Sequence, residues 1–175
     1  MTGVQTCALP ICRKILYNST RKIDLYSIIT PPPKGLYRCR IIYDNDIQSI
    51  EYIPYTPKNI ESIKIISSNI DYSLKYADRN ELDNLLKLNL YDEVIIEKNG
   101  LLTDTTIANI ALYDGKVWFT PQTPLLEGTM RAKLLYDGFV HTKNIKKEDL
   151  HLYSHLALMN AMIGFKILKR GIITL

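Results

Sequence analysis

Cysteine is scarce in this sequence, and its spacing points to no site. The 175 residues include three cysteines, Cys7, Cys12 and Cys39, and no pair has the C-x-x-C spacing of a metal site. An odd number of cysteines provides no disulfide framework. The cysteine content therefore argues against a disulfide-stapled scaffold and predicts a protein of the reducing cytoplasm.

Long apolar runs and stripes of like charge are also missing. No uninterrupted apolar stretch is long enough to cross a bilayer. The 22 Lys and Arg residues exceed the 18 Asp and Glu residues only slightly, and the two kinds are mixed along the chain. We therefore expect neither a membrane protein nor a basic face that binds nucleic acid.

No metal site is predicted either. The three histidines are His141, His151 and His155, and the last two are four residues apart. On a helix such a pair could bind a metal ion. The sequence from Ser154 onward, however, is typical of the start of a strand, where the two side chains would not converge.

What the sequence does contain is the composition of a globular chain, 46% hydrophobic and 23% charged. Asn99-Gly100 and Asp114-Gly115 predict tight hairpin turns. Alternation and β-forming residues predict strands over 36–43, 47–55, 62–67, 93–97, 107–113, 116–120, 139–145, 155–160 and 165–168.

Helices are predicted in four places between these strands. Apolar residues over 13–29 predict a helix that the triple proline at 31–33 ends. A second helix is predicted over 78–88, with Asp78 as its N-cap and Glu81 completing a capping box. Gly128 is expected to open a third helix, and 147–150 a short fourth. The predicted fold class is α+β with many hairpins.

The first eleven residues are not expected to belong to the fold. Residues 1–11, MTGVQTCALPI, are identified as the translation of a common sequencing-library adapter read from a GTG codon. The stretch has neither the basic region nor the cleavage site of a signal peptide. We interpret it as an artefact and expect the native start to lie upstream.

Three segments of the second half carry candidate chemistry. Lys75 comes shortly before the predicted helix at 78–88, and Asp104 lies among threonines between two predicted strands. Gly128 follows a proline-bounded loop and precedes Thr129 and Met130. Taken singly, Lys75 could be a solvated lysine, Asp104 could close a turn, and Gly128 could be an ordinary helix start.

In this order and spacing, the segments resemble the class IV aminotransferases. The matching stretches are Lys75 with Arg79, Thr103-Asp104 followed by Asn109, and Leu126-x-Gly128-Thr-Met-Arg131. The segment Leu158-Met-Asn-Ala161 with Gly164 is similar to the family's closing segment. The resemblance implies a two-domain fold type IV enzyme, like D-amino-acid aminotransferase, dependent on pyridoxal 5'-phosphate.

The resemblance also implies roles for five residues. Lys75 would form the Schiff base with the cofactor and transfer protons. Asp104 stands where the family has a glutamate, one methylene longer, that holds the pyridine nitrogen protonated. Gly128, Thr129 and Met130 would bind the phosphate at a helix N-terminus; here the family's hydroxyl position is shifted by one residue.

The implied organisation is a truncated, incomplete small α/β domain over 12–56 and a pyridoxal-phosphate-binding domain over 57–175. The family also implies a homodimer and a small-molecule amino substrate. The short chain favours 4-amino-4-deoxychorismate lyase, which releases pyruvate and 4-aminobenzoate. The alternatives are transamination of branched-chain or D-amino acids, and a non-catalytic scaffold or inactive fragment.

Overall fold

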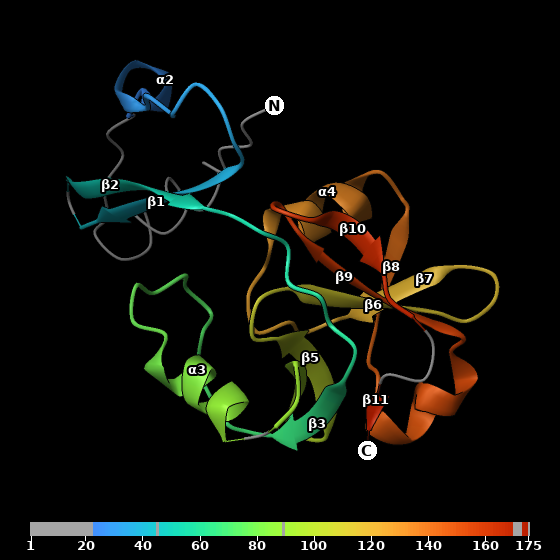
Figure 1. The fold of residues 1–175 in the computed structure, drawn as a ribbon. Helices are drawn as coiled ribbons and strands as arrows, with labels where there is room; N and C mark the ends of the chain where they lie inside the picture. The colour runs from blue at the N-terminus through green and yellow to red at the C-terminus, as the bar shows by residue number, and fades with distance from the viewer. Residues whose placement is uncertain (1–22, 45, 89, 170–172, 175) are drawn as a thin grey trace. The chain divides into compact units, whose positions relative to one another are not determined.

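The chain divides into two compact units, Met1–Pro57 and Lys58–Leu175. The computed structural model describes residues 23–44, 46–88, 90–169 and 173–174. The adapter-like stretch at 1–11 and most of the helix predicted over 13–29 lie outside these residues. Each unit is considered by itself below (Figure 1).

The first unit is a helical turn followed by a hairpin. Helix α2 spans Leu25–Ile28, and its N-cap Asp24 accepts a hydrogen bond from the Tyr26 N–H. Strands β1 (Tyr37–Tyr43) and β2 (Ile47–Pro54) pair antiparallel. The hairpin predicted here is confirmed, and α2 ends before the triple proline as expected.

The second unit is built on one mixed sheet. Its strands are β3 (Ile63–Ser67), β4 (Glu93–Lys98), β5 (Leu101–Thr105), β6 (Asn109–Tyr113), β7 (Trp118–Pro121), β8 (Val140–Lys143), β9 (His155–Asn160), β10 (Gly164–Ile167) and β11 (Ile173–Thr174). The order across the sheet is β10-β9-β6-β5-β4-β3-β11, with β7 and β8 branching from β6. Strand β3 pairs parallel with β4 and with β11.

The predicted hairpin at Asn99-Gly100 joins β4 to β5. Both residues have positive φ, 53° and 75°, as a two-residue hairpin turn of this kind requires. One strand was missed: residues 101–105 form β5, so Asp104 lies inside a strand and not between two strands. The polar run Thr103-Asp104-Thr105 is typical of an exposed loop, but all three side chains are buried in the structure. The strand was missed for this reason.

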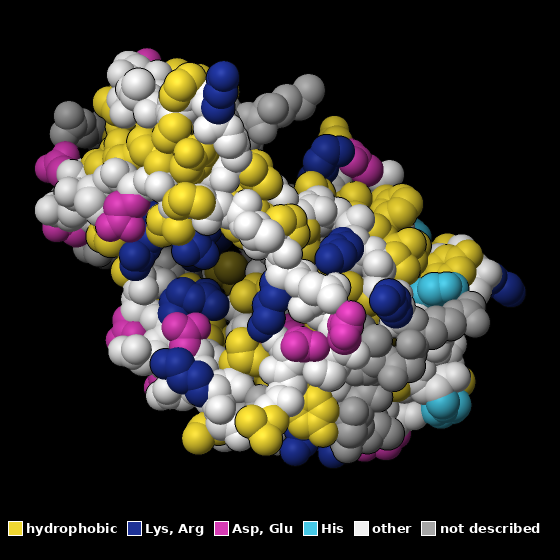
Figure 2. Space-filling model, viewed as in Figure 1, with side chains coloured by type: hydrophobic (Ala, Val, Ile, Leu, Met, Phe, Trp, Pro, Cys, Tyr) yellow, Lys and Arg dark blue, Asp and Glu magenta, His cyan; other side chains and the backbone are white. Residues whose placement is uncertain are grey.

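Helices α3 (Asn80–Lys87) and α4 (Thr129–Tyr136) and the 3₁₀ helix Lys147–Leu152 complete the unit. The capping box predicted at Asp78 is wrong. Arg79 is the N-cap and makes no side-chain cap, while Asp78 accepts a hydrogen bond from Asn80 N–H in a local turn. No helix in the described part of the chain is long and apolar enough to cross a membrane. Acidic and basic side chains both occur across the face drawn in Figure 2.

Strand β4 is buried on both sides, which explains the uninterrupted apolar run Val94-Ile95-Ile96 at its centre. Ile95 packs into one apolar cluster, with Ile63 and Ile110. Val94 and Ile96 point to the opposite side, as alternation along a strand requires, and join the cluster that holds Leu82 of α3 and Leu125. Helix α3 and the loop before α4 therefore cover the same apolar cluster, and the candidate site lies between them.

Candidate functional site

The central polar group is the carboxylate of Asp104, which is 4% exposed. Asp104 pairs with Asn109 across β5 and β6. Its Oδ1 accepts a hydrogen bond of 2.8 Å from Asn109 Nδ2, and its Oδ2 accepts one of 2.9 Å from the Leu126 N–H. The Leu125 N–H also interacts with this carboxylate and favours its ionised form.

Burial raises the pKa of Asp104 from 3.8 to about 7, because an ionised carboxylate loses its hydration there. The hydrogen bonds from Asn109 and Leu126 and the charge of Arg131 act against this rise. Arg131 lies in the first turns of α4, is 5% exposed, and donates to the Pro121 carbonyl. Burial lowers the pKa of Arg131 in turn.

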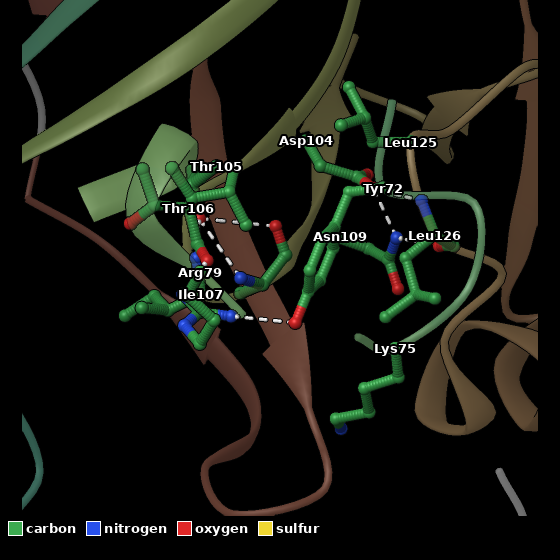
Figure 3. Close-up of a pocket in the computed structure, with 12 residues that line it drawn as sticks. Tyr72, Lys75, Arg79, Asp104, Thr105, Thr106, Ile107, Asn109, Leu125 and Leu126 are labelled. Carbon is green, nitrogen blue, oxygen red and sulfur yellow. Dashed lines mark hydrogen bonds between the residues drawn. The ribbon is translucent and has the colours of Figure 1, made fainter. Parts of the chain in front are cut away.

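Lys75 lies on the irregular segment between β3 and α3, and its side chain is exposed. It lines a cavity of about 80 Å³ together with Asp104, although Figure 3 shows the Lys75 side chain extending away from that carboxylate. The cavity is lined by Tyr72, Lys75, Arg79, Leu82, Asp104, Thr105, Thr106, Ile107, Ala108, Asn109, Leu125 and Leu126. The structure thus brings together two predicted residues that are 29 positions apart.

A second cavity, of about 320 Å³, adjoins the first and shares Tyr72, Arg79 and Leu82 with it. Both cavities lie wholly within the second unit. The shared residues all come from the segment that carries Lys75 or from α3. This segment therefore forms a wall of both spaces.

Gly128, Thr129 and Met130 lie at the start of α4, as predicted, but they do not line the cavity. The Met130 side chain packs into an apolar cluster with Ala111 and Val140. Gly128 instead abuts the site through Asn109, since a Cβ at position 128 would stand 2.1 Å from Asn109 Oδ1. A glycine is needed here for close packing, whatever else its backbone binds.

Asn109 received no role in the sequence prediction, although it organises the site. Its Nδ2 donates to Asp104 Oδ1 and also, at 2.7 Å, to the Leu126 carbonyl. The detectable signal was the amide side chain at the start of β6, whose next three residues, Ile110-Ala111-Leu112, are apolar. Tyr72 gave no such signal, because nothing local indicates that a tyrosine hydroxyl will be used.

Residues 73–169 match the family of class IV aminotransferases. This span covers more than half of the chain and contains the amine, the buried carboxylate and the α4 start described above. The chain belongs to the class IV aminotransferases. The match agrees with the resemblance inferred from Lys75, Asp104 and Gly128.

Two relatives from Haemophilus resemble this class IV aminotransferase over most of its length. A protein of Haemophilus influenzae is 38% identical over 152 residues, which are 84% of this chain and 81% of the relative. A crystal structure from Haemophilus somnus, provisionally named a 4-amino-4-deoxychorismate lyase, is 37% identical with a TM-score of 0.80. That alignment covers 90% of this chain and 86% of the other.

A more distant structure bears on the fold alone. It is a provisionally named amino-acid aminotransferase of Mesorhizobium loti, 18% identical, with a TM-score of 0.69 over 99% of this chain and 84% of that one. The α+β fold type IV architecture expected from the sequence is confirmed by these likenesses.

The residues present fit the cofactor that the family implies. Pyridoxal phosphate needs a primary amine and an acidic group for its ring nitrogen. Lys75 and Asp104 line one cavity, and the Asp104 carboxylate is buried there. Because the Asp104 carboxylate is buried, its ionised form is stabilised by a nearby positive charge such as a protonated ring nitrogen.

Proposed function

We propose that this class IV aminotransferase is a pyridoxal-phosphate enzyme with 4-amino-4-deoxychorismate lyase activity. The reaction splits the substrate into pyruvate and 4-aminobenzoate, without a second substrate. The observation that carries the proposal is the joint presence of Lys75 and Asp104 in one cavity of a chain 37% identical to the Haemophilus somnus protein. A Schizosaccharomyces pombe protein provisionally named aminodeoxychorismate lyase is 25% identical over 138 residues, 73% of this chain and 58% of that one.

Lys75 would supply the amine to which the cofactor is attached, and its Nζ would then remove and return a proton on the substrate. When bound, the cofactor supplies an electron sink for the carbanion that proton removal creates. Lys75 is exposed on an irregular segment and lines the same cavity as Asp104.

Asp104 would hold a proton on the ring nitrogen, and its surroundings suit that task. With a pKa of about 7, the carboxylate takes up a proton readily when the site is empty. A cationic group placed beside it would lower that pKa and keep Asp104 ionised. Arg131 and the hydrogen bonds from Asn109 and Leu126 already favour the ionised form.

The first turn of α4 would bind the phosphate through backbone N–H groups of Gly128, Thr129 and Met130. Backbone N–H groups point outward at a helix N-terminus, and the helix dipole favours an anion there. The helix has eight residues and begins directly after Gly128. We further propose that the enzyme is a homodimer, as the family implies, which the mass in solution would test.

Borohydride trapping tests the proposal directly. The protein is incubated with pyridoxal phosphate, reduced and digested, and the labelled lysine is identified by mass spectrometry. We expect the label on Lys75, and its loss in Lys75→Arg, while Lys116→Arg at an exposed hairpin position serves as the matched control. Pyruvate release from aminodeoxychorismate is then measured without any 2-oxo acid.

Each result assigns a function. Pyruvate release without an acceptor supports the lyase. A strict requirement for a 2-oxo acid would replace it with amino-acid transamination. Absence of label, or label spread over surface lysines, would leave a non-catalytic member of the family.

A further inference from the structure

The segment that carries Lys75 is held by a tyrosine on its own chain. Tyr72 is 8% exposed, and its hydroxyl donates a hydrogen bond of 3.0 Å to the Tyr76 carbonyl. This bond spans four residues and closes the backbone around Lys75. Because the segment is neither helix nor strand, few backbone hydrogen bonds hold it otherwise, and the Tyr72 hydroxyl is a main constraint on its shape.

Arg79 ties this closed loop to the sheet. Its Nη1 donates to the Tyr72 hydroxyl at 3.2 Å, and its Nη2 donates to the Thr106 carbonyl at 2.7 Å (Figure 3). The guanidinium carbon also lies 5.5 Å from the centre of the Tyr72 ring, within cation–π range. One guanidinium therefore bridges the lysine segment and the connection between β5 and β6, two residues after Asp104.

Thr106 is in turn a fixed anchor. Its N–H and its hydroxyl both donate to Oε1 of Glu93, at 3.2 and 2.7 Å. Glu93 is fully buried at the start of β4. The position of the Thr106 carbonyl is thus set by a buried carboxylate at the start of β4, so the bridge through Arg79 ends on a buried part of the fold.

We propose that Arg79 is a positioning residue that sets the place of Lys75 relative to Asp104, by bridging the Tyr72 hydroxyl and the Thr106 carbonyl. The role given to Lys75 here rests on the proposed function, whereas the hydrogen bonds of Arg79 are independent of that function. The planar guanidinium reaches two acceptors from one side chain, whereas a lysine ammonium is a single point of attachment.

The test compares four variants of the full chain. Arg79→Lys keeps the positive charge but cannot donate to both acceptors from one planar group. Arg79→Ala leaves space for an added guanidinium ion. Tyr72→Phe combined with Arg79→Ala removes one of the two groups to be bridged. Asp83→Asn is the matched control, because the exposed Asp83 carboxylate lies one helical turn away, with 3.8 Å between its Oδ1 and Arg79 Nε, and the substitution leaves the backbone bond between the two residues in place.

Two readouts are taken. Hydrogen exchange of the peptide covering 71–79 reports the bridge without any cofactor. Borohydride trapping reports the share of label on Lys75. For Arg79→Lys we expect faster exchange over 71–79 and a share on Lys75 lower by about tenfold or more, since small misplacements of a reacting group have effects of this size. Asp83→Asn should match the unchanged protein.

Chemical rescue separates positioning from general loss of structure. Guanidinium at millimolar concentration should restore the label on Lys75 in Arg79→Ala, but not in the double variant that also lacks the Tyr72 hydroxyl. Unchanged labelling in Arg79→Lys, or failure of the rescue, would overturn the inference. If the unchanged protein takes no label at all, the proposed function fails. Exchange then decides the bridge alone: faster exchange in Arg79→Lys upholds it, and unchanged exchange overturns it.

Discussion

The two units of this chain differ in how they bury their apolar side chains. In the first unit, β1 and β2 form a ribbon of half-buried and exposed residues, and Leu25 is the buried residue among those described over 23–57. In the second unit, β4 is buried on both sides between two apolar clusters.

The comparison shows why the chemistry is found in the second unit. A carboxylate such as Asp104 acquires an unusual pKa only where neighbouring side chains exclude water. Apolar clusters lie on both sides of the sheet, and Glu93 and Thr106 are also buried there. Among the residues described over 23–57, the half-buried ribbon of β1 and β2 places no carboxylate in such surroundings.

The largest expected effect is a difference between the two units in how much free energy of unfolding is lost when an isoleucine is shortened to alanine. Ile95→Ala removes a side chain with no exposure from β4 and should lower the free energy of unfolding by about 2–5 kcal/mol. Ile50→Ala, at a half-buried position of β2, should cost less than about 2 kcal/mol. Urea unfolding of the two variants measures both values. Equal losses would mean that the ribbon is as tightly packed as the sheet.

The next largest expected effect is a pH dependence of the free energy of unfolding, which we expect from Asp104 in the second unit and not from the ribbon of the first. Between about pH 4 and 7, native Asp104 holds a proton that the unfolded chain has released, so the contribution of Asp104 to stability is greatest below about pH 4 and falls as the pH rises to about 7. The whole fall amounts to at most about 4 kcal/mol.

Unfolding of the cofactor-free protein across this pH range measures the fall. Asp104→Asn should remove it, while Glu51→Gln in the ribbon should retain it. A fall that persists in Asp104→Asn would assign the titration to another group.

A smaller effect is expected at two glycines. Gly128→Ala places a Cβ against Asn109 Oδ1 and should cost about 1–3 kcal/mol while also reducing the label on Lys75, because Asn109 holds Asp104. Gly35→Ala in the first unit is strained by a φ of 106° and should cost about 1 kcal/mol without affecting the label. Loss of label in Gly35→Ala would tie the first unit to the site.

The smallest effect is expected in the ribbon. Arg40 and Glu51 form an ion pair of 3.4 Å between β1 and β2, and both side chains are 43% exposed. Arg40→Gln should change the free energy of unfolding by less than about 0.5 kcal/mol, because solvent screens such pairs. The same urea experiment in low and high salt checks this. A loss above about 1 kcal/mol would show that the ribbon depends on its surface charges.

Local chemistry made much of the fold predictable. The hairpins at Asn99-Gly100 and between β1 and β2 follow from turn residues and alternation, and α4 begins at the glycine expected to open it. The prediction failed where an interaction that the local sequence pattern does not include determined the structure. Asp78 was expected to cap α3, but its carboxylate closes a turn one residue earlier. Strand β5 was missed because buried polar residues do not alternate with apolar ones.

By itself, the sequence determined the family, the strand-rich α+β class and the choice of Lys75 and Asp104 as candidates, since these depend on residue order and short-range periodicity. Only the tertiary structure decided that the two line one cavity, that burial raises the pKa of Asp104, and that Arg79 bonds Thr106, 27 positions away. These properties depend on which side chains exclude water and which distant segments meet. Both depend on how side chains from distant parts of the chain pack together, which short sequence patterns do not predict.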